Sequence, residues 1–173
     1  MIIKPGGTMD LLAQSVTDPA TGGKTDLIAV MGGEPDAMFR KAIAEMGGMG
    51  RFVKEGDSVV IKPNIGWDQP PEVGANTDPD LVGLVVKKCF EAGAKEVLCF
   101  DHTCGNDWQN RYKISGIAEK VESNGGKMVA GNDEFMFVDH DIPRGKSLKH
   151  AKVHKLTVVS YTHLRAHETP EHL

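Results

Sequence analysis

Four side chains that could carry acid–base or metal chemistry lie close together in the chain: Asp101, His102, Cys104 and Asp107. Histidine titrates near neutral pH, so His102 with Asp101 is a candidate catalytic acid–base pair. Imidazole, thiolate and carboxylate also suit zinc or another transition metal, which makes His102, Cys104 and Asp107 candidate ligands. Their spacing matches no established ligand pattern. The alternative interpretation is that Asp101 caps the following loop and Cys104 is a small buried group.

A second candidate site is Lys62-Pro63-Asn64, at the end of an apolar run. Lys62 and Asn64 lie on the same side of an extended chain, because side chains alternate along a strand. A lysine at a strand end can bind a phosphate or carboxylate, and Asn64 can orient it. In the alternative interpretation Lys62 extends its ammonium to water and Asn64 hydrogen-bonds its own turn.

The two tryptophans of the chain, Trp67 and Trp108, follow these two motifs. Aromatic side chains in such loops can wall a ligand pocket. They can equally seal the top of the core, which is the commoner arrangement. With Lys62 and Asn64, both are candidate ligand-binding residues.

The three cysteines, Cys89, Cys99 and Cys104, are too few for a disulfide framework and contain no Cys-x-x-Cys pair. An iron–sulfur cluster usually needs four thiolates, so the chain alone does not supply one. Cys89 and Cys99 fall within an apolar helix and an apolar strand, and we interpret both as inert core residues.

The elements that must position these motifs alternate between strand and helix. Apolar runs predict strands, and Asp78-Pro79 predicts the start of a helix, since aspartate caps helices and proline suits their first turn. The predicted strands are 26–31, 58–63, 95–101 and 127–130, with shorter ones at 135–138 and 153–159, and the helices follow Pro35, follow Asp78 and span 112–123.

This order is typical of an α/β fold with a mostly parallel sheet and helices on both faces, incomplete at the C-terminal end. Right-handed crossovers place the carboxyl ends of all the strands at one edge. Open α/β sheets bind their ligands at that edge. We therefore expect Lys62 and Asp101 to lie on the same edge.

The composition is that of an ordinary globular protein, with 40% hydrophobic and 25% charged residues. A net charge of −4 provides no general attraction for nucleic acid, so no nucleic-acid partner is expected. No apolar run approaches the ~20 residues needed to span a bilayer.

Four separated segments resemble the bacterial family known as domain of unknown function 362. They are 59–68 (VVIKPNIGWD), 76–82 (NTDPDLV), 90–95 (FEAGAK) and 100–104 (FDHTC). The resemblance covers about residues 26–159. It implies an α/β fold and marks Lys62, Pro63, Asn64, Asp101, His102 and Cys104 as motif positions.

The same resemblance implies an association with ferredoxin-type modules or iron–sulfur proteins. A cluster would then belong to a partner or to a segment beyond this chain. Family members continue past this point, whereas the stretch 160–173 resembles translated sequencing adapter. The expected organisation is a flexible arm over 1–25, a partial α/β domain over 26–159 and a non-native disordered tail over 160–173.

Three functional hypotheses follow. The leading one is an α/β domain that binds a small anionic ligand or a metal at the strand edge and is linked to redox chemistry. The first alternative is a hydrolase or transferase that uses His102 and Asp101. The second is a non-catalytic docking module for a ferredoxin-type protein. No apolar leader precedes the domain, so the expected location is cytoplasmic, although relatives are often exported.

Overall fold

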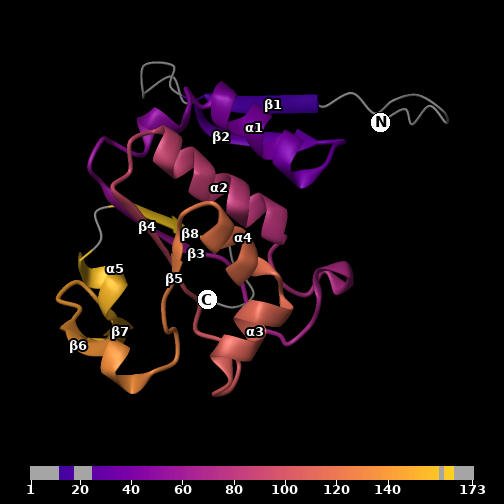
Figure 1. Cartoon of the computed structure of the whole chain (residues 1–173). Coiled ribbons are helices and arrows are strands. Elements are labelled where there is room, and N and C mark those ends of the chain that lie inside the picture. The colour runs from indigo at the N-terminus through magenta and orange to yellow at the C-terminus, as the bar shows by residue number, and fades with distance from the viewer. Residues whose placement is uncertain (1–11, 18–24, 160–161, 166–173) are drawn as a thin grey trace. The chain divides into compact units, whose positions relative to one another are not determined.

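The computed structural model describes residues 12–17, 25–159 and 162–165 of the chain, with side chains described for 27–158. The chain divides into two units, Met1–Arg51 and Phe52–Leu173 (Figure 1). The candidate motifs all lie in the second unit. The two units are therefore described separately.

The first unit contains an antiparallel strand pair and a helix. Strand β1 (Leu12–Thr17) pairs with β2 (Thr25–Met31), and helix α1 (Pro35–Glu45) and the 3-10 turn η2 (Met49–Arg51) follow. The prediction that 26–31 begins the parallel sheet is wrong, because β2 pairs with β1 in a separate sheet. An apolar run indicates a strand but not its partner. The helix does begin at Pro35, as predicted.

The second unit is built on a parallel sheet with the strand order β5-β4-β3-β8. Its strands are β3 (Ser58–Lys62), β4 (Glu96–Cys99), β5 (Lys127–Met128) and β8 (Thr162–Arg165). All three pairings are parallel, and Ser58 of β3 lies opposite Glu96 of β4. The predicted α/β fold is confirmed. Strand β8 lies within the stretch that resembles adapter sequence.

Helix α2 (Pro79–Glu91) connects β3 to β4, and α3 (Trp108–Ile114) and α4 (Ile117–Ser123) connect β4 to β5. As predicted, Asp78 caps α2 by accepting a hydrogen bond from the Leu81 amide, at 2.8 Å. The prediction of a single helix over 112–123 is wrong. Gly116 adopts a φ of 73°, which a helix cannot accommodate, and it separates α3 from α4.

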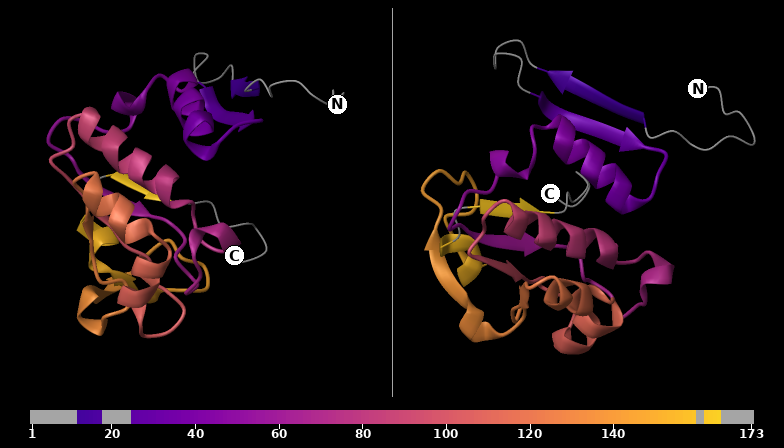
Figure 2. Two further views of the ribbon diagram at one scale, coloured as in Figure 1. Left: turned by 45° about the vertical axis from the view of Figure 1, so that its right-hand side comes forward. Right: turned by 45° about the horizontal axis from the view of Figure 1, so that its top comes forward.

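Helices α2 and α4 pack side by side (Figure 2), α2 against β4 and α4 against β5. In the strand order, β4 lies next to β3 and β5 lies on the far side of β4, so both connections cross the sheet in the same direction. Right-handed crossovers therefore place α2 and α4 on one face. Helix cover on the second face stays a prediction. The buried core of the second unit contains Val59, Val60, Ile61, Val82, Val86, Cys89, Val97, Cys99, Ile117 and Val121.

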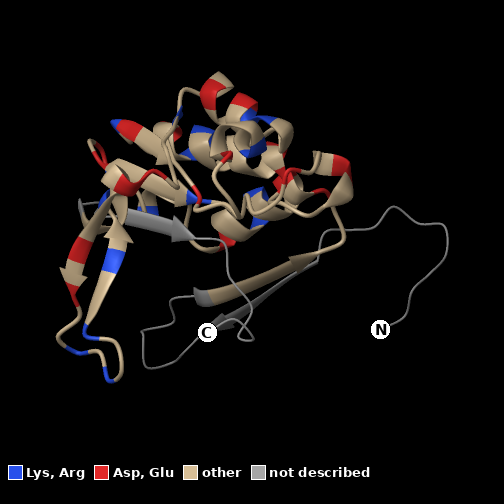
Figure 3. Cartoon of the chain, turned by 90° about the horizontal axis from the view of Figure 1, so that it is seen from below, with Lys and Arg blue, Asp and Glu red and all other residues tan. Residues whose placement is uncertain are grey.

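A separate antiparallel hairpin follows β5, made of β6 (Phe137–Asp141) and β7 (His150–His154). The 3-10 turn η4 (Glu134–Met136) precedes it, and helix α5 (Lys155–Val159) follows it. The predicted strands at 135–138 and 153–159 are therefore only partly correct. Figure 3 shows basic residues gathered at the connection between β6 and β7, where Arg144, Lys146 and Lys149 are exposed.

In the described part of the chain, no helix is long and apolar enough to cross a membrane.

Candidate functional site

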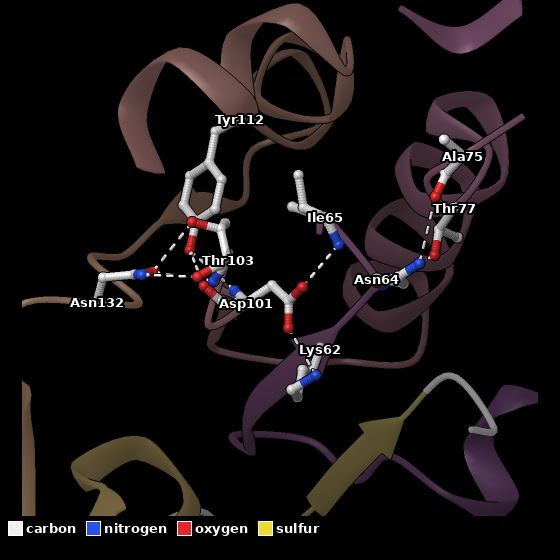
Figure 4. Close-up of polar contacts among 9 residues, drawn as sticks. All are labelled: Lys62, Asn64, Ile65, Ala75, Thr77, Asp101, Thr103, Tyr112 and Asn132. Carbon is white, nitrogen blue, oxygen red and sulfur yellow. Dashed lines mark hydrogen bonds and ion pairs between the residues drawn. The ribbon is translucent and has the colours of Figure 1, made fainter. Parts of the chain in front are cut away.

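The ends of β3 and β4 meet at one edge of the sheet through an ion pair between Lys62 and Asp101. The Lys62 Nζ lies 2.6 Å from Asp101 Oδ1 (Figure 4). The Asp101 side chain is only 4% exposed, whereas that of Lys62 is 26% exposed. The prediction that the two strand ends share an edge is confirmed, since β3 and β4 are parallel neighbours.

Asp101 also forms hydrogen bonds through its side chain and its backbone. Its Oδ2 accepts a hydrogen bond from the backbone amide of Ile65, at 2.7 Å, in the loop after β3. Its own backbone amide donates to the Tyr112 hydroxyl, which in turn donates to the Asp101 carbonyl, at 2.9 and 2.7 Å. Asp101 therefore ties together the loop after β3, the loop after β4 and helix α3.

Tyr112 is a site residue that the sequence analysis missed. It is 2% exposed and lies beneath the start of the loop after β4. Burial raises the pKa of its hydroxyl, so the group stays neutral and can donate to Asp101. Its position near the start of the predicted helix carries no signal for this contact, which depends on how α3 packs against the strand end.

The loop after β4 is also bound to the segment after β5, through Thr103, Gly131 and Asn132. The Thr103 amide donates to Asn132 Oδ1, at 3.0 Å, and Asn132 Nδ2 donates to the Thr103 carbonyl, at 2.9 Å. A Cβ at Gly131 would overlap the Asp101 carbonyl oxygen, so only glycine permits this approach. The sequence analysis missed Gly131 and Asn132, because no pattern of residue spacing predicts a contact between separate loops.

Asn64 and Trp67 lie in the loop after β3. The Asn64 amide donates to Thr77 Oγ1, at 2.9 Å, and its side chain donates to the Ala75 carbonyl, at 3.4 Å. Asn64 thus helps to close its own loop, as the alternative interpretation expects. Trp67 is 57% exposed, with its backbone held by the Asn76 side chain, and it does not seal the core.

Trp108 begins α3 and lies partly buried against Tyr112, with ring centroids 5.1 Å apart. Its indole Nε1 donates to Asp133 Oδ1, at 2.9 Å. This bond links the start of α3 to the segment after β5. Trp108 is therefore part of the framework of the edge, and its ligand-binding role stays a prediction.

The proposed metal ligands are not brought together in this structure. His102 and Cys104 are exposed, and Asp107 caps α3 by accepting from the Asn110 amide, at 3.3 Å. Among the described residues, no group of three His, Cys, Asp or Glu side chains could hold a metal ion. The interpretation of Cys104 as a buried group is wrong, since its loop carries it to the surface.

The acid–base pair of His102 and Asp101 is also not formed. Both carboxylate oxygens of Asp101 are occupied, one by Lys62 and the other by the Ile65 amide. The exposed His102 ring instead lies nearly perpendicular to the Phe137 ring, with centroids 5.6 Å apart. Consecutive residues of an extended chain point in opposite directions, which explains why these neighbours do not pair.

Cys89 and Cys99 are both buried, as predicted. Burial raises the pKa of the Cys89 thiol to about 12. It raises the pKa of the Cys99 thiol further, and the nearby charge of Asp101 acts in the same direction. Both groups are neutral thiols at physiological pH and behave as small apolar side chains.

His154, at the end of β7, is a further residue that the sequence analysis did not single out. It is 4% exposed and stacks on Phe100, the residue before Asp101, with ring centroids 3.9 Å apart. Its Nε2 lies 2.9 Å from the Ala130 carbonyl. Burial lowers the pKa of its imidazole, and this outweighs the opposing effect of the Ala130 bond. His154 thus supports the strand end beneath Asp101.

Comparison with known proteins shows which family the chain belongs to. The family model described as a domain of unknown function, DUF362, matches residues 59–170, and the chain belongs to that family. It is 30% identical over 113 residues to the thylakoid-associated protein sll1697 of Synechocystis sp.. That match covers 57% of this chain and 33% of the relative, so the chain spans about a third of that protein's length. No solved structure gives a significant match.

Proposed function

We propose that the edge formed by the ends of β3 and β4 binds a small anionic ligand through Lys62. The observation that supports this most directly is the Lys62–Asp101 pair, in which the carboxylate is buried and the lysine side chain is 26% exposed. The Ile65 amide holds Asp101 independently of the lysine. Asp101 therefore acts as a positioning residue that presents the Lys62 ammonium at the edge.

A positively charged group held in place by its surroundings loses little conformational freedom when an anion binds, which favours binding. The attraction between ammonium and anion is also stronger at a partly buried site than in bulk water. The ligand class in this proposal is a small molecule that carries a phosphate or a carboxylate.

The test measures the rise in melting temperature on addition of inorganic phosphate, compared with chloride at the same ionic strength. We expect phosphate to raise the melting temperature of the unchanged chain and of Lys87→Met, which removes an exposed lysine on α2. Lys62→Met should lose the phosphate-specific rise. An equal rise in Lys62→Met and Lys87→Met would refute the proposal.

Lys62→Met also leaves the buried Asp101 without its cation. Removing one partner of a buried ion pair lowers the free energy of unfolding by roughly 3–5 kcal/mol. Each variant is therefore compared with its own melting temperature in chloride. Lys62→Arg keeps the positive charge beside Asp101 and is the second variant. We expect it to keep at least part of the phosphate response.

The other functional hypotheses have less support. The metal-binding and redox-linked version stays a prediction, since no three-ligand cluster forms among the described residues. Acid–base catalysis would require Asp101 to release Lys62 or the Ile65 amide. Docking of a ferredoxin-type partner and a cytoplasmic location also stay predictions, and the name of the Synechocystis relative describes that protein only.

A further inference from the structure

The guanidinium of Arg111 lies beneath the loop after β4 with two of its nitrogens buried and unpaired. In the described part of the chain, neither Nε nor Nη1 of Arg111 has a hydrogen-bond partner. Arg111 belongs to α3 and directly precedes Tyr112, which binds Asp101. The unpaired charge therefore belongs to the same loop and helix as the edge described above.

Unpaired buried donors of this kind are unusual. A buried polar group without a partner costs about 1–3 kcal/mol, and a charged one costs more. Arginine does not escape this cost by losing its proton, because its guanidinium stays charged in proteins. The buried, unpartnered Nε and Nη1 groups of Arg111 therefore indicate an acceptor that is not one of the described side chains.

The acceptors nearest in the chain form hydrogen bonds with donors other than Arg111. Gly105, against which Arg111 packs, has a carbonyl that accepts from Asn132 Nδ2, at 2.8 Å. The Asp107 side chain caps α3, and Asp133 Oδ1 accepts from Trp108. Both carboxylate oxygens of Asp101 are occupied as well. Three carboxylates thus lie in these two connected segments, yet the Arg111 guanidinium is paired with none of them.

We infer that Arg111 is a second binding residue of this edge and that it binds an oxyanion of the ligand, a phosphate or a carboxylate. This inference rests on the proposed anion-binding function and extends it from Lys62 to a residue on a different element. The planar guanidinium presents pairs of N–H donors that match the two oxygens of such a group. Nε and Nη1 lie on different edges of the guanidinium, and each forms a donor pair with Nη2.

Gly105 makes this arrangement sterically possible. Its φ of 91° is one that glycine readily adopts, and a Cβ there would lie 3.1 Å from Arg111 Nη1. The loop can therefore lie directly against the guanidinium. Because Nε and Nη1 are buried in the structure, the oxyanion reaches them when the loop around Gly105 moves outward.

The experiment compares Arg111→Met, Arg111→Lys and the control Lys113→Met, which removes an exposed charge from the same helix. Binding of inorganic phosphate and of malonate to the full chain is measured by calorimetry, together with the melting temperature in each anion and in chloride. Phosphate and malonate distinguish the two sources of the oxyanion. Phosphate also stabilises proteins generally, but that effect is the same for all variants.

We expect Arg111→Met to weaken binding of the preferred anion at least tenfold and to abolish its specific rise in melting temperature. Arg111→Lys should bind more weakly than the unchanged chain, because lysine keeps the charge but loses the planar donor pair. In chloride, Arg111→Met should melt at the same or a higher temperature, since it removes an unpaired buried charge. A purely structural arginine would instead lower the melting temperature.

Two results would overturn the inference, and they can be told apart. If Arg111→Met binds both anions as tightly as Lys113→Met while Lys62→Met does not, the proposed function stands and the role of Arg111 is refuted. If the unchanged chain binds neither anion, both proposals are refuted. In the first of these cases, a lower melting temperature of Arg111→Met in chloride assigns Arg111 to the framework of the loop.

Discussion

Asp101 illustrates how a single buried residue organises the edge of this sheet. Removing a carboxylate from water costs several kcal/mol unless its oxygens are satisfied. Here one oxygen accepts from the Lys62 ammonium and the other from the Ile65 amide. Tyr112 satisfies the backbone groups of the same residue. Asp101, which the sequence suggested as an acid–base catalyst, therefore has a structural role in connecting the segments at this edge.

His154 supports the same region and carries a prediction about pH. Its Nε2 is 2.9 Å from the Ala130 carbonyl, and its Nδ1 is 3.3 Å from the Leu156 amide. The two contacts together require a neutral ring that donates from Nε2 and accepts at Nδ1. Burial, chiefly, lowers the pKa of His154, and the nearby His102 and Lys155 act in the same direction.

A lowered pKa in the folded state means that the unfolded chain binds the proton more readily. Stability from His154 is therefore complete above the ordinary histidine pKa of about 6.5 and is lost as the pH falls towards the lowered value. We expect the free energy of unfolding to decline between pH 7 and 5, measured by urea titration. His154→Gln should make this decline shallower.

The control for His154→Gln is His140→Gln, which replaces an exposed histidine of β6. A decline of the same steepness in His154→Gln and in the unchanged chain would show that His154 is not the group responsible.

At the scale of elements, the order of strands decides which face the helices cover. The chain steps from β3 to β4 to β5 in one direction, so α2 and α4 lie on the same face of the sheet. They approach closely at Gly83, where a Cβ would lie 3.1 Å from Lys120 Cβ. The contact between these helices therefore depends on a small residue in α2.

The break between α3 and α4 allows a test of how the edge is built. Gly116 has a φ of 73° and separates α3, which carries Arg111 and Tyr112, from α4. We expect Gly116→Ala to lower the free energy of unfolding by about 1–2 kcal/mol, because an alanine pays a steric cost in the left-handed region. Thermal or urea unfolding measures the difference.

Gly116→Asn is the matched variant, since asparagine tolerates this conformation better than alanine. A Cβ at Gly116 would make only ordinary contacts, 3.5 Å from Pro71 and 3.6 Å from Pro79. Equal losses in the alanine and asparagine variants would therefore argue against a conformational cause.

At the scale of the whole molecule, the division into Met1–Arg51 and Phe52–Leu173 separates the β1–β2 pair from the candidate site. Lys62, Asp101, Arg111 and Tyr112 all lie in the second unit. The two tryptophans, Trp67 and Trp108, lie there too. Tryptophan fluorescence therefore reports the second unit alone, whereas far-ultraviolet circular dichroism reports both.

This division predicts that the two units unfold separately. Ala29→Pro, in the middle of β2 opposite Gln14, should disrupt the pairing with β1 because proline lacks the amide hydrogen. We expect the circular dichroism signal to change while the stability reported by tryptophan fluorescence shifts by less than about 0.5 kcal/mol. A larger loss in fluorescence-detected stability would show that the units unfold together.

The sequence by itself determined the local features of this protein. Apolar runs identified β3, β4 and β5, and Asp78-Pro79 marked the start of α2. The alternation of strand and helix correctly predicted a parallel α/β sheet with Lys62 and Asp101 at one edge. These features depend on hydrophobic periodicity, helix capping and the handedness of crossovers, which short stretches of chain encode.

Only the tertiary structure decided which side chains meet. It paired Lys62 with Asp101, placed Tyr112 beneath the strand end and left the Arg111 guanidinium unpaired under the loop after β4. It also turned the His102 ring towards Phe137, away from a pairing with Asp101, and placed β2 in a two-stranded sheet with β1. Such contacts depend on how elements distant in the chain pack together, and they produce no regular pattern of residues in the sequence.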